Sequence, residues 1–371
     1  MQVLIAVWSE PNLEESPQKY PLLAVICSCV LVLSIASSTE SGPVPPGHLI
    51  DIGGRRLHLN CTGSGAPTIV AESGLGAFSA DWTLVQPEAS KFTRFCSYDP
   101  ARYAWSDSGP ALDMVYETVD DLRMLLRKAG VDPPYVLIGA SIGGLFVRAY
   151  QRRFPEQVSG LVLDDASSEH FLDFQIEGKD KVLADTSAEE LRRMFEAYLR
   201  VPATPRVLPT TVEAPADRLP KEAQSARLWA LRKLMSSEPV IPTFSGVESW
   251  REEFIALRPQ SPLSHPLGDL PLIVLTRGLN TDNRRREVAA EFAALSRVGK
   301  LVVAEQSEHE IHIYRPDLVA QSLKEVVEAE RKGIESPNPI NRKLGSNRCS
   351  PGQRSLRGLS GITMSQQLPL R

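Results

Sequence analysis

A serine lies in a short glycine-framed stretch near the middle of the 371-residue chain, Gly139-Ala-Ser141-Ile-Gly143. The apolar residues 135–138 before it are typical of a buried strand, and residues from Gly144 onward have helical spacing. A sharp turn between strand and helix exposes its middle residue in a strained backbone conformation, at the positive end of the helix. A serine there can attack a carbonyl if a base takes its proton. We predict that Ser141 is a nucleophile; the alternative is a glycine-rich turn with an incidental serine.

The composition of the chain excludes several other kinds of chemistry. The net charge of −4 gives no reason to expect a nucleic-acid partner. The sequence has no phosphate-binding glycine loop ending in Lys-Ser/Thr and no Cys/His cluster at zinc spacing. Its five cysteines are too scattered for a disulfide scaffold. We therefore expect a small-molecule substrate, no nucleic acid, and neither cofactor nor metal; the oligomeric state cannot be read from the sequence.

The elements that must position Ser141 alternate between strands and helices. A hairpin over residues 48–63 turns at Gly53-Gly54, and short apolar strands follow at 67–71, 92–98, 135–138, 160–163, 271–276 and 300–304. Between them, helical spacing appears over 81–91, 112–129, 144–154, 284–296 and 316–332. This alternation predicts an α/β fold with a mostly parallel sheet covered on both faces.

The alternation stops between residues 166 and 269. Helical spacing over 186–199, 223–236 and 247–257 is separated there by proline-rich connectors. We interpret this stretch as a helical lid inserted between core strands. The predicted parts are an apolar segment and linker (1–46), a first core part (47–165), the insert (166–269), a second core part (270–332) and a disordered basic tail (333–371).

Residues 21–36 are almost wholly apolar and are followed by small residues. Such a stretch is typical of an export signal or a short membrane anchor. The acidic flank, Glu10, Glu14 and Glu15 against Lys19, opposes this interpretation because a signal usually begins with positive charge. We predict a secreted or periplasmic, or membrane-anchored, protein that associates with membrane through residues 21–36; the alternative is a cytoplasmic protein.

Several separated motifs resemble the α/β-hydrolase superfamily, most closely its lid-bearing, esterase-like serine hydrolases. The resemblance spans residues 48–332 and includes five stretches: Glu-Ser-Gly-Leu-Gly at 72–76 with Asp81-Trp82, Cys-Ser-Tyr-Asp at 96–99 with Trp-Ser-Asp at 105–107, the Ser141 turn, residues 160–165, and Ser-Glu-His at 307–309. It implies the α/β-hydrolase fold and says little about the substrate.

The resemblance also implies where the partners of Ser141 lie. His309 follows the last core strand, where this fold supplies its base, and His312 could replace it. Asp165 ends the strand after the serine helix, whereas Asp282 follows the next core strand, and the superfamily uses both positions for the acid. We prefer Asp165, because the resembled sequences most often carry an aspartate at this place, and keep Asp282 as the alternative. The remaining histidines are expected in structural or surface roles: His48, His58, His170 and His265.

Backbone N–H groups must stabilise the oxyanion that forms during attack. The resemblance places one at Ile142, directly after the nucleophile, and the other at Leu75 in the turn over 73–76; the alternative is a plain glycine turn. The strands that carry Cys61 and Cys96 are neighbours in this fold, so the resemblance allows a disulfide, with two buried free thiols as the alternative.

Two features depart from the pattern of the resembled family. Carboxylates flank the predicted base at Glu308 and Glu310, and residues 100–102 read Pro-Ala-Arg where related sequences have Arg-Ala-Gly, so Arg102 replaces a glycine. Two carboxylates would raise the pKa of His309, replace the acid in its orienting role, or simply face water.

The preferred hypothesis is a serine hydrolase that cleaves a small-molecule carboxylic ester or related acyl bond by a Ser-His-Asp acyl-enzyme mechanism. The alternative, motivated by the two departures, is a catalytically weak ligand-binding or sensor protein on the same scaffold. A dehalogenase or epoxide hydrolase is disfavoured because those families carry aspartate in place of Ser141.

Overall fold

The computed structural model describes residues 42–109, 114–168, 208–236 and 265–335, with short pieces at 174–176, 179–181, 187, 189–190, 193, 251–253 and 255–258. The predicted apolar segment at 21–36 and the tail beyond 335 lie outside the described residues, as do His170 and most of the predicted helix 186–199. Of the predicted helix 247–257, residues 251–253 and 255–257 are described, and they are helical. Among the helices of the described part, none is both long and apolar enough to cross a membrane.

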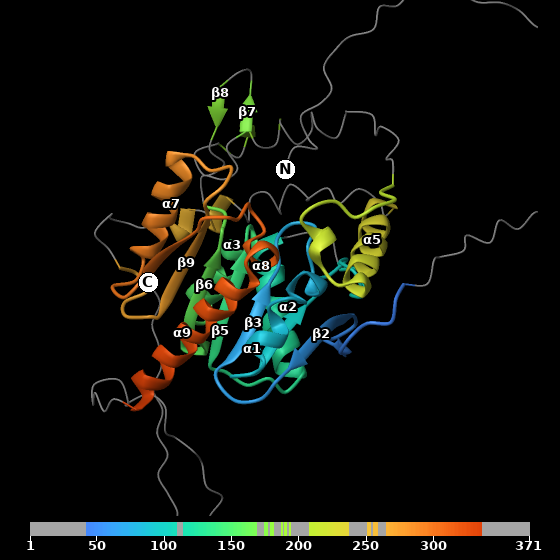
Figure 1. Ribbon diagram of the computed structural model, residues 1–371, viewed down its shortest axis with the longest axis horizontal. Coiled ribbons are helices and arrows are strands. Elements are labelled where there is room, and N and C mark those ends of the chain that lie inside the picture. Colours follow the sequence, from blue (N-terminus) through green and yellow to red (C-terminus); the bar gives the residue numbers. More distant parts are fainter. Residues whose placement is uncertain are drawn as a thin grey trace, which may run out of the picture. The chain divides into compact units, whose positions relative to one another are not determined.

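An eight-stranded sheet forms the centre of the fold (Figure 1). Its strands run in the order β1-β2-β4-β3-β5-β6-β9-β10. The antiparallel pairs are β1 with β2 and β2 with β4, and every later pair is parallel. The bounds are β1 His48–Asp51, β2 Arg56–Thr62, β3 Thr68–Glu72, β4 Phe95–Tyr98, β5 Tyr135–Ala140, β6 Val158–Asp164, β9 Leu272–Arg277 and β10 Lys300–Ala304.

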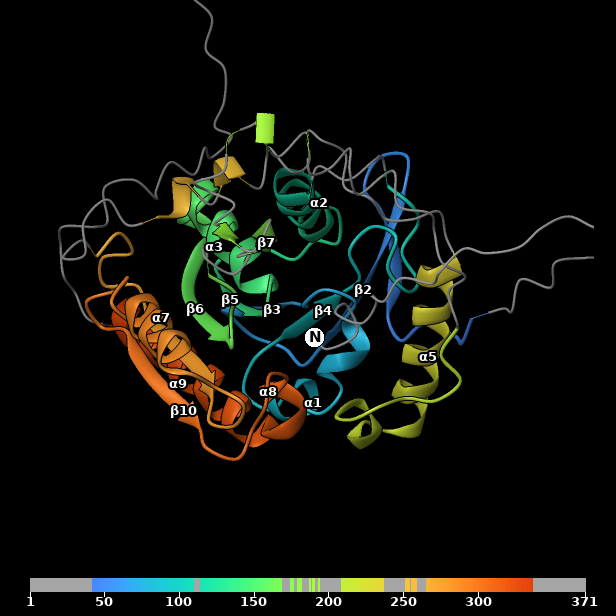
Figure 2. The ribbon, with the colours of Figure 1, turned by 90° about the horizontal axis from the view of Figure 1, so that it is seen from above.

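Helices cover both faces of this sheet, as the alternating sequence predicts (Figure 2). One buried cluster joins the strands to α2 Met114–Lys128, α3 Gly143–Arg153 and α7 Asn283–Ala293. The other joins the opposite face to α1 Gln86–Ala89, α8 Ile311–Tyr314 and α9 Pro316–Glu335. Strands β3 and β5 are buried along their whole length, so they take the central places.

The predicted helix 81–91 is instead two short helical segments, η1 Ser79–Trp82 and α1. The reason lies in two local signals. The Asp81 carboxylate accepts a hydrogen bond from the Phe78 N–H at 2.8 Å, which starts η1 early. Pro87 lies in the first turn of α1, where a missing N–H does no harm, and its ring opposes a helix that continues through it.

The described part of the insert contains the predicted helix 223–236 as α5 Lys221–Ser236, preceded by η4 Ala216–Arg218. It also contains a small antiparallel pair that was not predicted, β7 Phe174–Ile176 with β8 Lys179–Lys181. Trp229 of α5 packs 5.8 Å from Trp105 of the core, measured between ring centroids. The α5 helix is therefore seated on the core, and a lid movement of the insert stays a prediction.

Cys61 and Cys96 lie directly opposite each other on the antiparallel strands β2 and β4. Their sulfur atoms are 2.06 Å apart, which is a disulfide bond. Of the two alternatives left open by the sequence, the structure contains the paired form.

Candidate active site

Ser141 lies at the sharp turn between β5 and α3, with φ +54°. Only close approach of backbones permits this turn. A Cβ on Gly139 would meet the Gly143 carbonyl oxygen at 2.4 Å, and one on Gly143 would meet the Glu72 and Ser73 carbonyl oxygens at 2.7 Å. Side chains are thus excluded at both glycines, and the serine is held in the left-handed region that β-carbon-bearing residues rarely occupy.

The structure brings Ser141, His309 and Asp165 together at the carboxyl ends of the strands. His309 Nε2 lies 2.9 Å from Ser141 Oγ, and His309 Nδ1 lies 2.6 Å from Asp165 Oδ2. The Asp165 side chain is 2 % exposed and that of His309 is 27 % exposed. Asp165 follows β6 with φ +42°, so nucleophile and acid both have strained backbones. A hydroxyl, an imidazole and a carboxylate in this chain can transfer a proton from oxygen to nitrogen.

The alternative acid and base are engaged elsewhere. Asp282 caps α7, its carboxylate accepting a hydrogen bond from the Arg285 N–H at 2.7 Å. His312 is buried, with Nδ1 at 2.6 Å from Asp164 Oδ2, and its ring stacks on Trp82 with centroids 4.7 Å apart. A second His–Asp pair therefore lies one residue along β6 from the first, in the core.

The remaining predicted histidines occupy other positions. His58 is buried with Nδ1 at 3.1 Å from Asp99 Oδ2. His265 is exposed and contacts a backbone carbonyl, and His48 is an exposed residue of β1. Among the described residues there is no group of three or more His, Cys, Asp or Glu side chains arranged to hold a metal.

The turn over residues 73–76 passes beside the nucleophile. A Cβ on Gly74 would lie 3.0 Å from Ser141 Cβ and 3.7 Å from its Oγ. Leu75 comes next with its side chain 73 % exposed, whereas Ile142 on the other side is buried. The backbone of this turn thus lies beside Ser141, and the role of the Leu75 and Ile142 N–H groups as oxyanion donors stays a prediction.

A buried carboxyl, that of Glu72, lies directly before this turn in the sequence. Glu72 ends β3 and accepts a hydrogen bond from the Tyr98 hydroxyl. Burial raises the pKa of Glu72 to about 8, although the bond from Tyr98 opposes that rise. The carboxyl is therefore protonated at neutral pH. Next to it, the Trp82 indole N–H donates to Ser73 Oγ at 2.9 Å and fixes the start of the turn.

Arg277, at the end of β9, is a site residue that the sequence reasoning missed. Its Nε donates to Asp165 Oδ2 at 2.7 Å, its backbone N–H to Oδ1 at 3.2 Å, and its Nη2 lies 2.7 Å from His309 Nδ1. Arg285 Nη1 is also 3.6 Å from Asp165 Oδ2. Burial pushes the pKa of Asp165 upward, but His309 and Arg277 outweigh it, so the pKa is lowered and the carboxylate stays charged. An arginine directly after the predicted strand 271–276 was the available signal.

The two carboxylates that flank the base have partners of their own. Asn280 Nδ2 donates to Glu308 Oε1 at 2.7 Å. Glu310 precedes α8 and interacts electrostatically with Arg227 of α5, which also pairs with the buried Asp81. Burial lowers the pKa of Arg227. The two carboxylates are thus held locally, Glu308 by an amide and Glu310 by the attraction of a cation.

Arg102, which replaces a glycine of the resembled family, has φ +75°. It therefore adopts the conformation for which glycine is favoured. Its Nη2 donates to the Gly109 carbonyl at 3.0 Å and its N–H to the Asp107 carbonyl at 2.9 Å. The loop after β4 keeps its turn, with the strain held by these hydrogen bonds.

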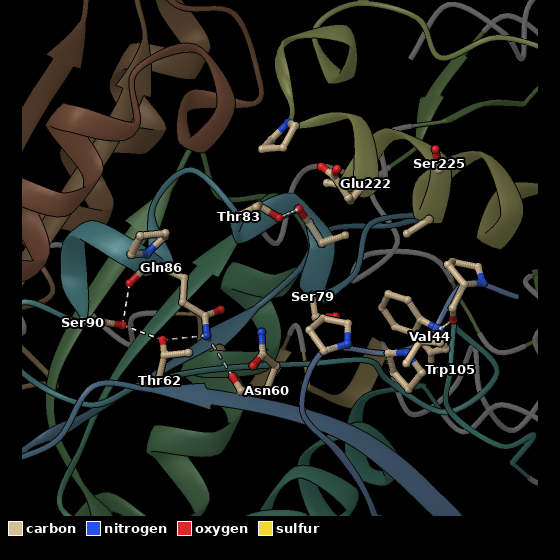
Figure 3. Close-up of a pocket in the computed structure, with 18 residues that line it drawn as sticks. Val44, Asn60, Thr62, Ser79, Thr83, Gln86, Ser90, Trp105, Glu222 and Ser225 are labelled. Atoms are coloured by element: carbon tan, nitrogen blue, oxygen red, sulfur yellow. Dashed lines mark hydrogen bonds between the residues drawn. The ribbon is translucent and has the colours of Figure 1, made fainter.

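A cavity of about 900 Å³ opens between the linker at 43–46, strand β2, the η1–α1 region and the start of α5 (Figure 3). Trp105, Val44 and several prolines make its lining mostly apolar. Hydroxyls on its wall have partners within the protein; for example, Gln86 Nε2 donates a hydrogen bond to Thr62 Oγ1 at 3.0 Å (Figure 3). None of its lining residues belongs to the Ser141–His309–Asp165 group.

Comparison with known proteins agrees with this architecture. Residues 67–237 match the family described as alpha/beta hydrolase fold. A solved thermophilic esterase from Thermogutta terrifontis is 22 % identical, with 74 % of this chain and 94 % of that chain covered and a TM-score of 0.50. The solved epoxide hydrolase CorEH is 15 % identical, with 76 % and 98 % covered and a TM-score of 0.51. At such identities the likeness shows the fold alone.

The match assigns residues 67–237 to the alpha/beta hydrolase fold family, and the mixed sheet and the serine turn agree with that fold. Among curated relatives, the "Probable transporter efuK" of Hormonema carpetanum is 33 % identical over 146 residues, which is 37 % of this chain and 21 % of that protein. The chain spans less than half the length of the curated relatives it matches. The comparisons support the α/β-hydrolase fold and leave open which bond the protein cleaves.

Proposed function

We propose that the protein is a serine hydrolase that cleaves a small-molecule carboxylic ester or a related acyl bond. The observation that carries the proposal is the chain of contacts from Ser141 Oγ to His309 Nε2 and from His309 Nδ1 to Asp165 Oδ2, at 2.9 and 2.6 Å. That chain matches the geometry of acyl transfer, in which a base activates a hydroxyl and an acid orients the base.

In the proposed mechanism, His309 takes the proton of Ser141 as Oγ attacks the substrate carbonyl. The backbone turn over 73–76 and the Ile142 N–H stabilise the oxyanion. His309 then gives its proton to the leaving alcohol, and an acyl group remains on Ser141. Water, deprotonated by His309, attacks the acyl-enzyme. The bond between the acyl carbon and Ser141 Oγ then breaks, His309 returns the proton to Oγ, and the acid is released. Asp165 remains charged throughout and stabilises the imidazolium that forms twice in the cycle.

A fluorophosphonate probe tests the nucleophile because it reacts only with an activated serine. We expect labelling of the wild type and none of Ser141→Ala, with equal circular dichroism and melting temperature for the two proteins. Absence of labelling in folded wild type would reject the hydrolase. Labelling without turnover on a panel of p-nitrophenyl esters of increasing acyl length would instead favour the ligand-binding alternative.

The acid is tested by two matched substitutions. Asp165→Asn is expected to lower kcat at least about a hundredfold because the imidazole loses its orienting carboxylate. Asp282→Asn keeps a side-chain oxygen that can accept from the Arg285 N–H, so it should change stability by less than about 0.5 kcal/mol and leave kcat nearly unchanged. The reverse ranking of kcat values would assign the acid to Asp282.

We also propose that the protein works outside the cytoplasm, exported or anchored through residues 21–36. The Cys61–Cys96 disulfide supports an oxidising compartment. Mass spectrometry of the protein from its native host is expected to find either a processed N-terminus after residues 21–36 or an intact chain in the membrane fraction. An intact chain in the cytoplasmic fraction with free thiols at both positions would contradict the proposal.

A further inference from the structure

Two groups of opposite chemistry meet at one nitrogen of the proposed base. Asp165 Oδ2 lies 2.6 Å from His309 Nδ1, and Arg277 Nη2 lies 2.7 Å from the same atom. The carboxylate can only accept a hydrogen bond there, whereas the guanidinium can only donate one. A neutral ring with its proton on Nδ1 donates to Asp165, whereas a ring with its proton on Nε2 would accept from Arg277 at Nδ1. Only the first form leaves Nε2 free to take the proton of Ser141, so it is the form that the proposed function requires.

The surroundings make the guanidinium effective. Arg277 contacts Asp165 Oδ2 through Nη2 at 2.6 Å and through Nε at 2.7 Å, so its position is fixed by a two-point contact. Its side chain is 14 % exposed, compared with 27 % for Arg285, the other cation near this carboxylate. Charges act more strongly on one another where water is excluded.

Several other charged groups lie near the base, and they come from its own loop and from the neighbouring strands and helices. The carboxylates of its own loop are held by Asn280 and by the interaction with Arg227, and the buried pair of Asp164 and His312 is internally compensated. The charged or titratable groups are Asp165 and Asp164 from the end of β6, Arg277 from β9, Arg285 from α7, Arg227 from α5, Glu308 and Glu310 beside the base, and His312 from α8.

We propose that Arg277 is a positioning residue that keeps His309 in its neutral, proton-accepting form. Its guanidinium orients Asp165 toward Nδ1 and opposes formation of the imidazolium, because two cations would then lie within hydrogen-bond distance. The base consequently remains able to accept a proton at lower pH than it would beside the carboxylate alone. The inference rests on the proposed function, because the neutral form of His309 matters only if His309 is the base. The protonation of the ring can nevertheless be measured without turnover.

The experiment follows the ring of His309 by NMR in the full chain labelled with ¹³C,¹⁵N-histidine, assigned with His309→Asn. In Arg277→Gln the midpoint of the His309 titration is expected to rise by about one pH unit. Arg277→Lys, which keeps the charge, should restore most of the wild-type value. Arg285→Gln is the matched control, and its midpoint should move by less than about a third of that amount because the charge is more distant and more exposed.

A midpoint in folded Arg277→Gln that equals the wild-type value would overturn the inference. If that variant does not fold, the wild type decides: at pH 7 its long-range ¹⁵N spectrum should show a neutral ring with the proton on Nδ1, and an imidazolium would overturn the inference. Fluorophosphonate labelling of the same samples separates the two hypotheses. Unlabelled wild type with the expected NMR shift rejects the hydrolase and keeps the role of Arg277.

Discussion

The backbone of Ser141 stores strain that a glycine would release. Its φ of +54° lies in the left-handed region, which costs a residue with a β-carbon about 1–3 kcal/mol. The hydrogen bonds from the Ser141 N–H to the Asp164 carbonyl at 3.0 Å and from the Ser167 N–H to the Ser141 carbonyl at 2.8 Å hold it there. The strained backbone exposes the hydroxyl at the turn, and it does not stabilise the fold.

We expect Ser141→Gly to stabilise the protein by about 1 kcal/mol, after allowance for the greater freedom of glycine in the unfolded chain. Urea unfolding measures the change in free energy. Ser141→Ala is the matched control, since it removes Oγ and keeps the β-carbon and its strain. Equal stability of the glycine and alanine variants would show that the turn is relaxed.

Glu72 makes stability depend on pH. Burial raises the pKa of its carboxyl from the ordinary value of 4.5, which applies in the unfolded chain, to about 8 in the folded protein. Below pH 4.5 both states carry the proton and stability is at its full value. As pH rises from 4.5 to 8 only the unfolded state loses the proton, so the free energy of unfolding falls by about 1.4 kcal/mol per pH unit for this group.

Glu72→Gln should remove this slope, because an amide does not titrate. Its free energy of unfolding relative to wild type is expected to improve by several kcal/mol between pH 5 and pH 8. Urea unfolding at three pH values measures it, with Glu88→Gln, at an exposed position, as the control. A parallel pH dependence of wild type and Glu72→Gln would contradict the buried, protonated carboxyl.

At the scale of elements, the disulfide joins β2 to β4 across 35 residues of sequence. Closing a loop of this length restricts the unfolded chain and is expected to contribute about 3–4 kcal/mol to stability. Urea unfolding with and without a reductant measures the contribution. The double variant Cys61→Ser/Cys96→Ser should be insensitive to the reductant. A wild type that is equally insensitive would indicate that the two thiols are not paired in the isolated protein.

The sequence predicted most elements because hydrophobic periodicity and caps are local signals. The hairpin at β1–β2, the strands of the parallel sheet and α5 lie where the pattern placed them. The predicted helix 81–91 is divided before Pro87. The sequence showed Asp81 near the start of this helix, and only the structure shows that its carboxylate caps the preceding segment. The β7–β8 pair was missed because its residues have no clear alternation.

The site was predicted less completely than the fold, because its contacts span long stretches of sequence. The turn around Ser141 is local, and the resemblance to a family placed His309 and the choice between two acids. The contact of Arg277 with His309 and the pairing of His312 with Asp164 join residues 32 and 148 positions apart. Periodicity carries no information about such pairs, and only the assembled strand ends reveal them.

At the scale of the whole molecule, α5 is tied to the core at the side of the proposed site. Arg227 pairs with Asp81, whose side chain is 1 % exposed, and Arg218 lies 4.4 Å from the ring of Tyr314 in α8. Lys233 Nζ donates to the Ala104 carbonyl at 2.6 Å. The α5 helix is therefore fixed to the core by these contacts.

Arg227→Met should destabilise the protein by about 3 kcal/mol, because it leaves Asp81 buried and without its cation. Arg284→Met, at an exposed pair with Glu287, is the control and should change stability by less than about 0.5 kcal/mol. Urea unfolding compares the two variants. Similar small losses in both would mean that α5 is not held by this pair.

The hydrogen bonds between the serine turn and the end of β6 suggest the order in which the site forms during folding. Ser141 and Asp165 are 24 positions apart and lie at the ends of the adjacent strands β5 and β6, whereas His309 is 168 positions from the serine. Closing the longer loop loses more chain entropy, so nucleophile and acid should be in place before the base arrives. In refolding, circular dichroism is expected to recover before fluorophosphonate reactivity, and simultaneous recovery of both signals would contradict this order.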